Sequence, residues 1–171
     1  MSAAAAARAI PTTSPDHARE VDAAQLEAML DLLRRLEPDE WERPTDCDRW
    51  TVRQVVAHVV GASEEITRPW ISLRRIAIGA RRHPELSRLD RLNEVQVEDR
   101  ADRSGSELTD ELAALAPRRL RARRRMPQAI RRLPVLPGFD LPRGTRLAYG
   151  LDIITIRDVW MHRVDICLAT G

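Results

Sequence analysis

The spacing of the aliphatic residues most constrains how this 171-residue chain can fold. Leucine, valine, isoleucine and methionine recur at intervals of three and four, the period of one face of an α-helix, over four separate stretches. No stretch shows the alternation of apolar and polar residues that is typical of a half-buried β-strand. Four helical segments with aliphatic faces and no internal repeat predict an all-α protein, a four-helix bundle.

The first two helices are predicted from periodicity and from signals at their ends. The first spans residues 21–36 and stops before Pro38. Thr51 followed by Gln54 is a capping-box signature for the start of the second, whose apolar face continues to Trp70 with a kink expected at Pro69. Residues 1–16 lack such a pattern and are predicted to be a flexible N-terminal tail, so the folded domain is expected to cover residues 17–171.

The second half of the chain predicts two more helical regions. One runs from about residue 85 to 133, is broken, and restarts at a second capping box formed by Ser104 and Glu107. After a loop rich in proline and glycine, residues 145–169 form the last helix. Because this helix is apolar almost all round, we expect it to be the central and most buried element of the bundle.

Composition excludes several classes of protein. No apolar run approaches the roughly 20 residues that a membrane-spanning helix needs, and the first residues have no hydrophobic signal segment. We therefore expect a cytoplasmic protein without a membrane partner. Cys47 and Cys167, the only cysteines, are too few for a disulfide framework and are predicted to be buried thiols.

Polar groups set into the apolar helices are the candidates for chemistry. Asp158 and His162 are four residues apart, on one face of the last helix, and His58 lies beside small residues at the edge of the valine face of the second. Two histidines and a carboxylate from facing helices can form a three-ligand site with an open position, as in a catalytic zinc or a non-haem ferrous centre. The alternative, a hydrogen-bonded Asp–His pair beside a core histidine, is favoured by spacing alone.

Two segments of the chain resemble the mycothiol-dependent maleylpyruvate isomerase family, which belongs to the DinB-like metalloenzyme superfamily. The first contains Trp41, Pro44, Thr45, Cys47 and Trp50 and leads into residues 51–58, TVRQVVAH; the second is residues 157–165, RDVWMHRVD. The resemblance covers most of the chain from the first helix to Gly171. It implies a DinB-like four-helix bundle and a divalent metal, usually zinc, held by His58, Asp158 and His162.

The resemblance also implies the activity, with mycothiol as thiol cosubstrate. Zinc would turn the bound thiol into a thiolate that attacks a small electrophile, either adding reversibly in an isomerase or staying attached in a transferase. No side chain is predicted to be catalytic, because the chemistry is expected at the metal-bound thiol. Asp158 stands where the family often has glutamate. Many members continue into a small C-terminal domain, whereas this sequence ends nine residues after His162, as a single-domain member or a truncated one.

Several alternatives stay open at this stage. Between Glu111 and Asp140 the chain has eight arginines and no acidic residue. These arginines, from Arg118 to Arg132, could contact nucleic acid, attract an anionic substrate, or form a solvated face, and the scarcity of aromatic residues favours the last. A non-catalytic, metal-binding regulator and a homodimer also remain open. Asp165 could orient an imidazole or pair with Arg163.

Overall fold

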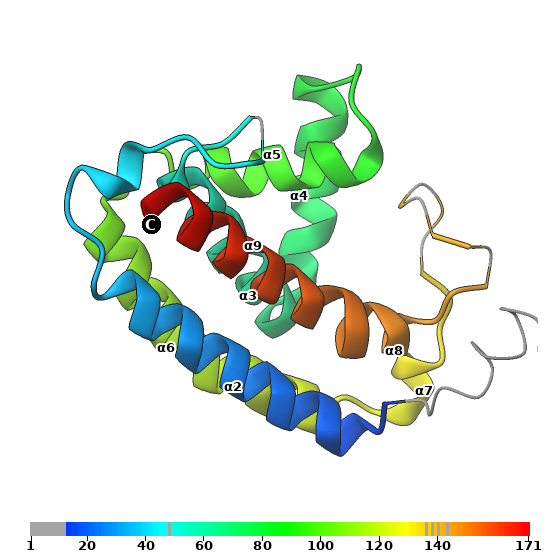
Figure 1. Cartoon of the computed structure of the whole chain (residues 1–171). Coiled ribbons are helices and arrows are strands. Elements are labelled where there is room, and N and C mark those ends of the chain that lie inside the picture. The colour runs from blue at the N-terminus through cyan, green and yellow to red at the C-terminus, as the bar shows by residue number, and fades with distance from the viewer. Residues whose placement is uncertain (1–12, 48, 136, 138, 140, 143) are drawn as a thin grey trace, which may run out of the picture.

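A computed structural model describes residues 13–47, 49–135, 137, 139, 141–142 and 144–171. Four long helices form the bundle: α2 (Pro15–Leu33), α3 (Val52–Thr67), α6 (Gly105–Arg125) and α9 (Thr155–Thr170). Each packs against two others, so that α2, α6, α3 and α9 follow one another around a closed ring (Figure 1). Over the described residues the elements are helical and the only extended pairings are isolated bridges, which confirms the predicted all-α four-helix bundle.

Shorter elements connect these four helices. They are η1 (Glu40–Glu42), α4 (Pro69–Arg82), α5 (Arg88–Glu98), α7 (Gln128–Arg131), α8 (Leu147–Tyr149) and the π-helical turn η2 (Gly150–Ile154). The α4 and α5 helices contact each other, and α5 also packs against α3 (Figure 1). No helix in the part of the chain described here is both long enough and apolar enough to cross a membrane.

The first long helix begins earlier than its apolar pattern predicts. The Ser14 side chain accepts a hydrogen bond from the backbone N–H of His17, and Pro15 occupies the first turn, so α2 starts at residue 15 and ends at Leu33. Serine followed by proline is a strong helix-start signal that periodicity alone overlooks. Residues 15 and 16 of the predicted tail are thus helical, and residues 1–12 lie outside the described part.

Both predicted capping boxes are present, but the second predicted helix is divided. Thr51 with Gln54 starts α3, and Ser104 with Glu107 starts α6. The predicted kink at Pro69 is a complete break: α3 ends at Thr67, and Arg68 has non-helical backbone angles. Proline has no N–H for the helix ladder and disfavours helical geometry at the residue before it.

The α3 helix, rather than the last helix, is the most buried element. Ten of its residues are buried: Val52, Val55, Val56, Ala57, His58, Val59, Val60, Gly61, Ser63 and Ile66. On α9 only Ile156, Val159 and Ile166 are buried. The prediction that the last helix is central and most buried is therefore wrong, because α9 packs mainly against α2 and α3, which cover one side of it.

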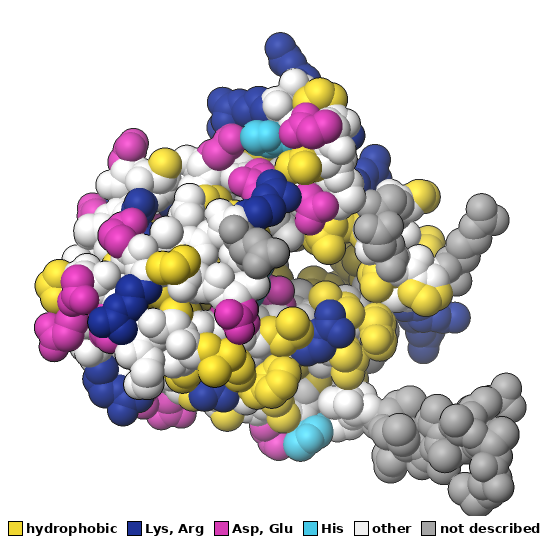
Figure 2. Space-filling view, turned by 45° about the horizontal axis from the view of Figure 1, so that its top comes forward, with side chains coloured by type: hydrophobic (Ala, Val, Ile, Leu, Met, Phe, Trp, Pro, Cys, Tyr) yellow, Lys and Arg dark blue, Asp and Glu magenta, His cyan; other side chains and the backbone are white. Residues whose placement is uncertain are grey.

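The uncovered side of α9 carries large apolar residues. Trp160, Met161 and Leu168 are 47%, 43% and 66% exposed. Hydrophobic side chains gather on one side of the molecule in the space-filling view, beside a hollow (Figure 2). The prediction of two buried thiols is also wrong. Cys167 is exposed because it lies on α9, and Cys47 is only partly buried against the core.

Candidate metal centre

The three predicted ligands come together where α3 faces α9. His58 belongs to α3, and Asp158 and His162 lie one turn apart on α9. One ligand atom from each of the three lies within 4.8 Å of the other two. His58 Nε2 is 3.2 Å from Asp158 Oδ2, and His162 Nε2 is 3.5 Å from Asp158 Oδ1. Both imidazole rings therefore present Nε2 to the same carboxylate.

Exposure differs across this cluster. The side chains of His58 and His162 are 5% and 12% exposed, whereas that of Asp158 is 33% exposed. The cluster is thus deep on its α3 side and accessible at Asp158. The Trp50 ring lies beside both imidazoles, with ring centroids 5.1 Å from His58 and 6.3 Å from His162. Trp50 therefore forms an apolar wall that shields the two rings from water.

In both ligand histidines, His58 and His162, the other ring nitrogen, Nδ1, has a hydrogen-bond partner. His162 Nδ1 lies 3.0 Å from Asp165 Oδ2. Of the two roles considered for Asp165, orienting an imidazole is therefore the one that its contact supports. Arg163 instead points to Gln25 Oε1, 3.4 Å away. His58 Nδ1 lies 2.7 Å from Oε1 of Gln96 on α5, a residue that sequence analysis missed.

Electrostatics prepare two of the three ligands for a cation. Burial would raise the pKa of Asp158, but the charge of His58 and its hydrogen bond outweigh burial and lower it. Burial lowers the pKa of His162, and the nearby Asp158 does not compensate. Burial would also lower the pKa of His58, yet Asp158 and Gln96 together raise it. A cation binding here would thus displace a proton from His58 more than from His162.

The remaining histidines lie outside this cluster. His17 is exposed and lies near Glu20, and His83 Nε2 is 2.7 Å from Glu98 Oε1. Among the described residues, His58, Asp158 and His162 form the group with metal-binding geometry.

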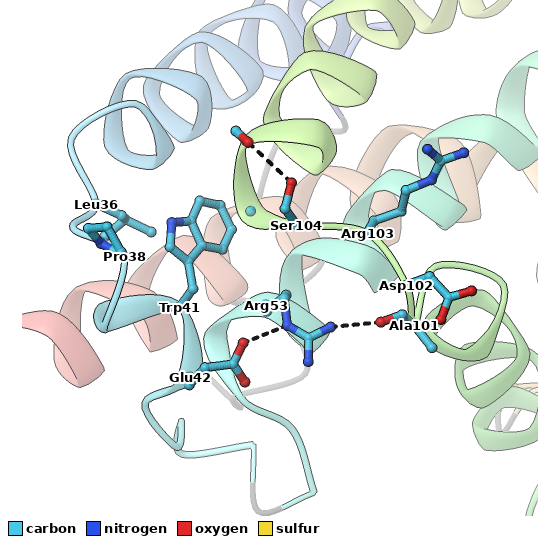
Figure 3. A pocket seen from close by; sticks show the side chains of 11 residues that line it. Leu36, Pro38, Trp41, Glu42, Arg53, Ala101, Asp102, Arg103 and Ser104 are labelled. Carbon is cyan, nitrogen blue, oxygen red and sulfur yellow. Dashed lines mark hydrogen bonds and ion pairs between the residues drawn. The ribbon is translucent and has the colours of Figure 1, made fainter.

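A large cavity elsewhere in the molecule has no comparable chemistry. It measures about 600 Å³ and is lined by the segment after α2, the start of α3 and the start of α6. In it Arg53 donates hydrogen bonds to the Glu42 carboxylate and to the Ala101 carbonyl, and Trp41 lies near Leu36 and Pro38 (Figure 3). The Arg53 guanidinium is thus already paired within the protein, so this cavity does not compete with the metal centre as the candidate site.

Comparison with known proteins gives the family. The model of the mycothiol maleylpyruvate isomerase N-terminal domain matches residues 22–167, which include all three predicted ligands. The chain belongs to this family. A solved structure, the crystal structure of the mycothiol-dependent maleylpyruvate isomerase, superposes with a TM-score of 0.65 at 14% sequence identity. The match confirms the DinB-like fold; it covers 90% of this chain and 61% of that one. No curated protein matches the chain significantly.

Proposed function

We propose that this chain is a mycothiol-dependent metalloenzyme, an isomerase or a thiol transferase, with a zinc-type metal site formed by His58, Asp158 and His162. The observation that carries the proposal is the convergence of two Nε2 atoms and one carboxylate within 4.8 Å, in a chain of the mycothiol maleylpyruvate isomerase family. Two imidazole nitrogens and a carboxylate are a donor set that suits zinc and leaves a fourth position open. The partners behind the two ring nitrogens, Gln96 and Asp165, also fit a metal site.

The residues of the chain would hold the ion and shield it from water on one side. His58, Asp158 and His162 would bind it, Asp165 would orient His162, and Trp50 would exclude water from one side. Zinc bound there would lower the pKa of a coordinated thiol, so that the thiol reacts as a thiolate at neutral pH. Asp158 is the most exposed of the three ligands, so a thiol and a small electrophile would approach the ion from its side.

Two outcomes of the thiol attack are compatible with this site. In an isomerase, the thiol sulfur adds to an activated double bond, the resulting single bond rotates, and the sulfur leaves again with the double bond restored. In a transferase, the sulfur displaces a leaving group and stays attached. Both need the same nucleophile and the same open position, so membership of the maleylpyruvate isomerase family is what puts the isomerase first.

The structure weakens the nucleic-acid alternative. Of the eight arginines between Arg118 and Arg132, three are buried and paired with carboxylates: Arg119, Arg123 and Arg131. Only the other five are exposed and could form a solvated face. The three buried arginines cannot reach the phosphates of a nucleic acid. An anionic substrate would have to be attracted by exposed arginines, since the buried ones are already paired.

Elemental analysis of the protein purified without a histidine tag tests the metal site. We expect about one zinc per chain in the wild type, and almost none in His58→Ala and His162→Ala with helicity retained. His17→Ala, on the exposed end of α2, is the matched control and should keep its zinc. Unchanged metal content in both site variants would contradict the proposed site.

Turnover separates an enzyme from a non-catalytic metal-binding bundle. Consumption of an electrophile such as maleylpyruvate should require mycothiol, stop when a chelator strips the metal, and return when zinc is added back. A protein that holds zinc in the wild type but shows no thiol-dependent turnover with a panel of electrophiles would instead support the regulatory alternative.

A further inference from the structure

We infer that Gln96 is a positioning residue that fixes the tautomer of His58, and that Glu65 fixes the orientation of Gln96. The inference rests on the proposed metal site and adds to it two residues from outside the ligand set. It places a buried chain of hydrogen bonds behind His58, running from α3 to α5 and back to α3 and α4.

The direction of each hydrogen bond follows from the far end of this chain. Glu65 Oε1 accepts from Gln96 Nε2 at 2.7 Å and from Arg75 Nη1 at 3.1 Å, and Arg75 can only donate. Glu65 Oε2 accepts from Ser72 Oγ at 3.0 Å. A carboxylate held by three donors requires the NH2 group of Gln96 on its side. The amide oxygen of Gln96 is then left for His58.

The orientation of Gln96 determines which nitrogen of His58 carries the hydrogen. Gln96 Oε1 lies 2.7 Å from His58 Nδ1 and can only accept, so Nδ1 must donate. Nε2 faces Asp158 Oδ2 at 3.2 Å and can donate to it while the ring is protonated. In a neutral ring with its hydrogen on Nδ1, Nε2 has its lone pair free. The chain of hydrogen bonds thus makes Nε2, and not Nδ1, the nitrogen that gives up its hydrogen and binds a cation.

Packing holds Gln96 in this position. Its side chain is buried, with 2% of the residue exposed, on the face of α5 that meets α3. Gly61 is the reason that it fits: a Cβ at residue 61 would lie 2.6 Å from Gln96 Cβ and 2.7 Å from Gln96 Cγ. Because the residue is buried and its amide has partners at both ends, the amide has no second orientation that satisfies both of them.

The Nδ1 atoms of the two histidines thus have different partners. Asp165, a carboxylate on the same helix, accepts from His162, whereas a neutral amide on another helix accepts from His58. Without Gln96, the His58 ring would gain by moving its hydrogen to Nε2 and donating it to Asp158 Oδ2, 3.2 Å away. That bond would occupy both ligand atoms, and a metal would have to break it.

Gln96→Met tests the inference, because methionine keeps the unbranched shape that Gly61 requires and removes the acceptor. In metal-free protein at about pH 9, where an ordinary imidazole is neutral, long-range proton–nitrogen NMR should show His58 with hydrogen on Nδ1 in the wild type. Gln96→Met should shift it to Nε2. Zinc affinity, measured by competition with a chromophoric chelator, should fall about 10- to 100-fold.

Two further variants keep the test independent of folding. Val95→Ala, a buried position on the same helix, should lose stability without changing the His58 tautomer or the zinc affinity. Glu65→Gln keeps the shape of the carboxylate, but its amide can either accept from the NH2 group of Gln96 or donate to the oxygen of Gln96. It should therefore populate the Nε2–H tautomer of His58 in part. An unchanged tautomer in both Gln96→Met and Glu65→Gln, or an unchanged zinc affinity in Gln96→Met, would overturn the inference. Failure of the wild type to bind zinc would instead contradict the proposed function. The NMR of the metal-free protein would still test whether Gln96 fixes the tautomer of His58.

Discussion

At the scale of single residues, Glu64 joins two buried guanidinium groups. Its Oε2 accepts from Arg75 Nη2 at 2.8 Å and from Arg100 Nη2 at 3.0 Å. Burial would raise the pKa of Glu64, but the hydrogen bonds and charges of Arg100 and Arg75 outweigh burial and lower it. A carboxyl whose pKa is lowered by folding stabilises the protein above its unfolded pKa, and this contribution is lost as pH falls through the folded pKa.

Glu64→Gln should therefore reduce stability most at neutral pH. We expect a loss of about 1–3 kcal/mol in the free energy of unfolding at pH 7, which shrinks as the pH falls below the ordinary glutamate pKa of 4.5. Urea unfolding at a series of pH values measures it. Glu20→Gln, at an exposed position on α2, is the control and should follow the wild type throughout. A Glu64→Gln loss that stays constant down to about pH 3 would contradict this assignment.

Single residues also show how far the sequence predicts the site. His58, Asp158 and His162 could be predicted because charged or titratable groups on apolar helix faces are conspicuous, and helical spacing says which of them share a face. Gln96 could not, because an uncharged side chain between Val95 and Val97 gives no pattern. Its partner His58 is 38 residues away, and only the packing of α5 on α3 brings the two together.

At the scale of elements, Gly61 sets how closely α3 and α5 approach. Gly61→Ala would place a methyl group against Gln96 Cβ and Cγ, so we expect a loss of stability of about 1–3 kcal/mol even though alanine is the better helix former. Gly150→Ala is the matched control, because a Cβ there meets no described atom within 4 Å, and it should be neutral or slightly stabilising. Thermal unfolding compares the two. A stabilising Gly61→Ala would mean that the helices can separate without cost.

Helix ends and helix burial differ in how well the sequence predicts them. Thr51–Gln54 and Ser104–Glu107 were predictable because a capping box is a local interaction that needs no tertiary context. The burial of α9 was not. Trp160, Met161 and Leu168 make the helix apolar on every side, but apolar residues do not say whether another element covers them. Trp70 is a similar case: the break at Arg68 removes it from the α3 face, and it is 65% exposed.

At the scale of the whole molecule, a buried charge cluster connects all four long helices. Asp22 on α2 binds Arg119 on α6 through two hydrogen bonds, Nη2–Oδ1 at 2.7 Å and Nε–Oδ2 at 3.2 Å. Arg119 also donates to Ser63 on α3 and to the Thr155 carbonyl on α9. Arg123 reaches Asp22 as well as Asp152 in the π-helical turn. Three of the eight arginines of the arginine-rich segment, Arg119, Arg123 and Arg131, therefore hold the bundle together from inside.

Asp22→Asn tests this role, because it keeps the shape of the side chain and removes its charge. The cluster has three arginines, Arg119, Arg123 and Arg131, for the two carboxylates of Asp22 and Asp152. The substitution would leave one carboxylate for three buried guanidinium groups, and a buried charge without its partner costs about 3–5 kcal/mol. Chemical unfolding measures the loss, with Asp31→Asn, an exposed aspartate on the same helix, as control.

The size of that loss distinguishes two ways of stabilising the bundle. If the apolar core carries the packing of α2 against α6, Asp22→Asn will cost no more than the exposed control, within about 0.5 kcal/mol. If the cluster carries it, all four helices should unfold in one transition at a lower denaturant concentration, because Arg119 bonds to residues of α2, α3 and α9 at once. The side chains of Asp22 and Arg119 are 0% and 1% exposed, so water cannot solvate the Arg119 guanidinium when Asp22 loses its charge. We therefore expect the cooperative loss of stability.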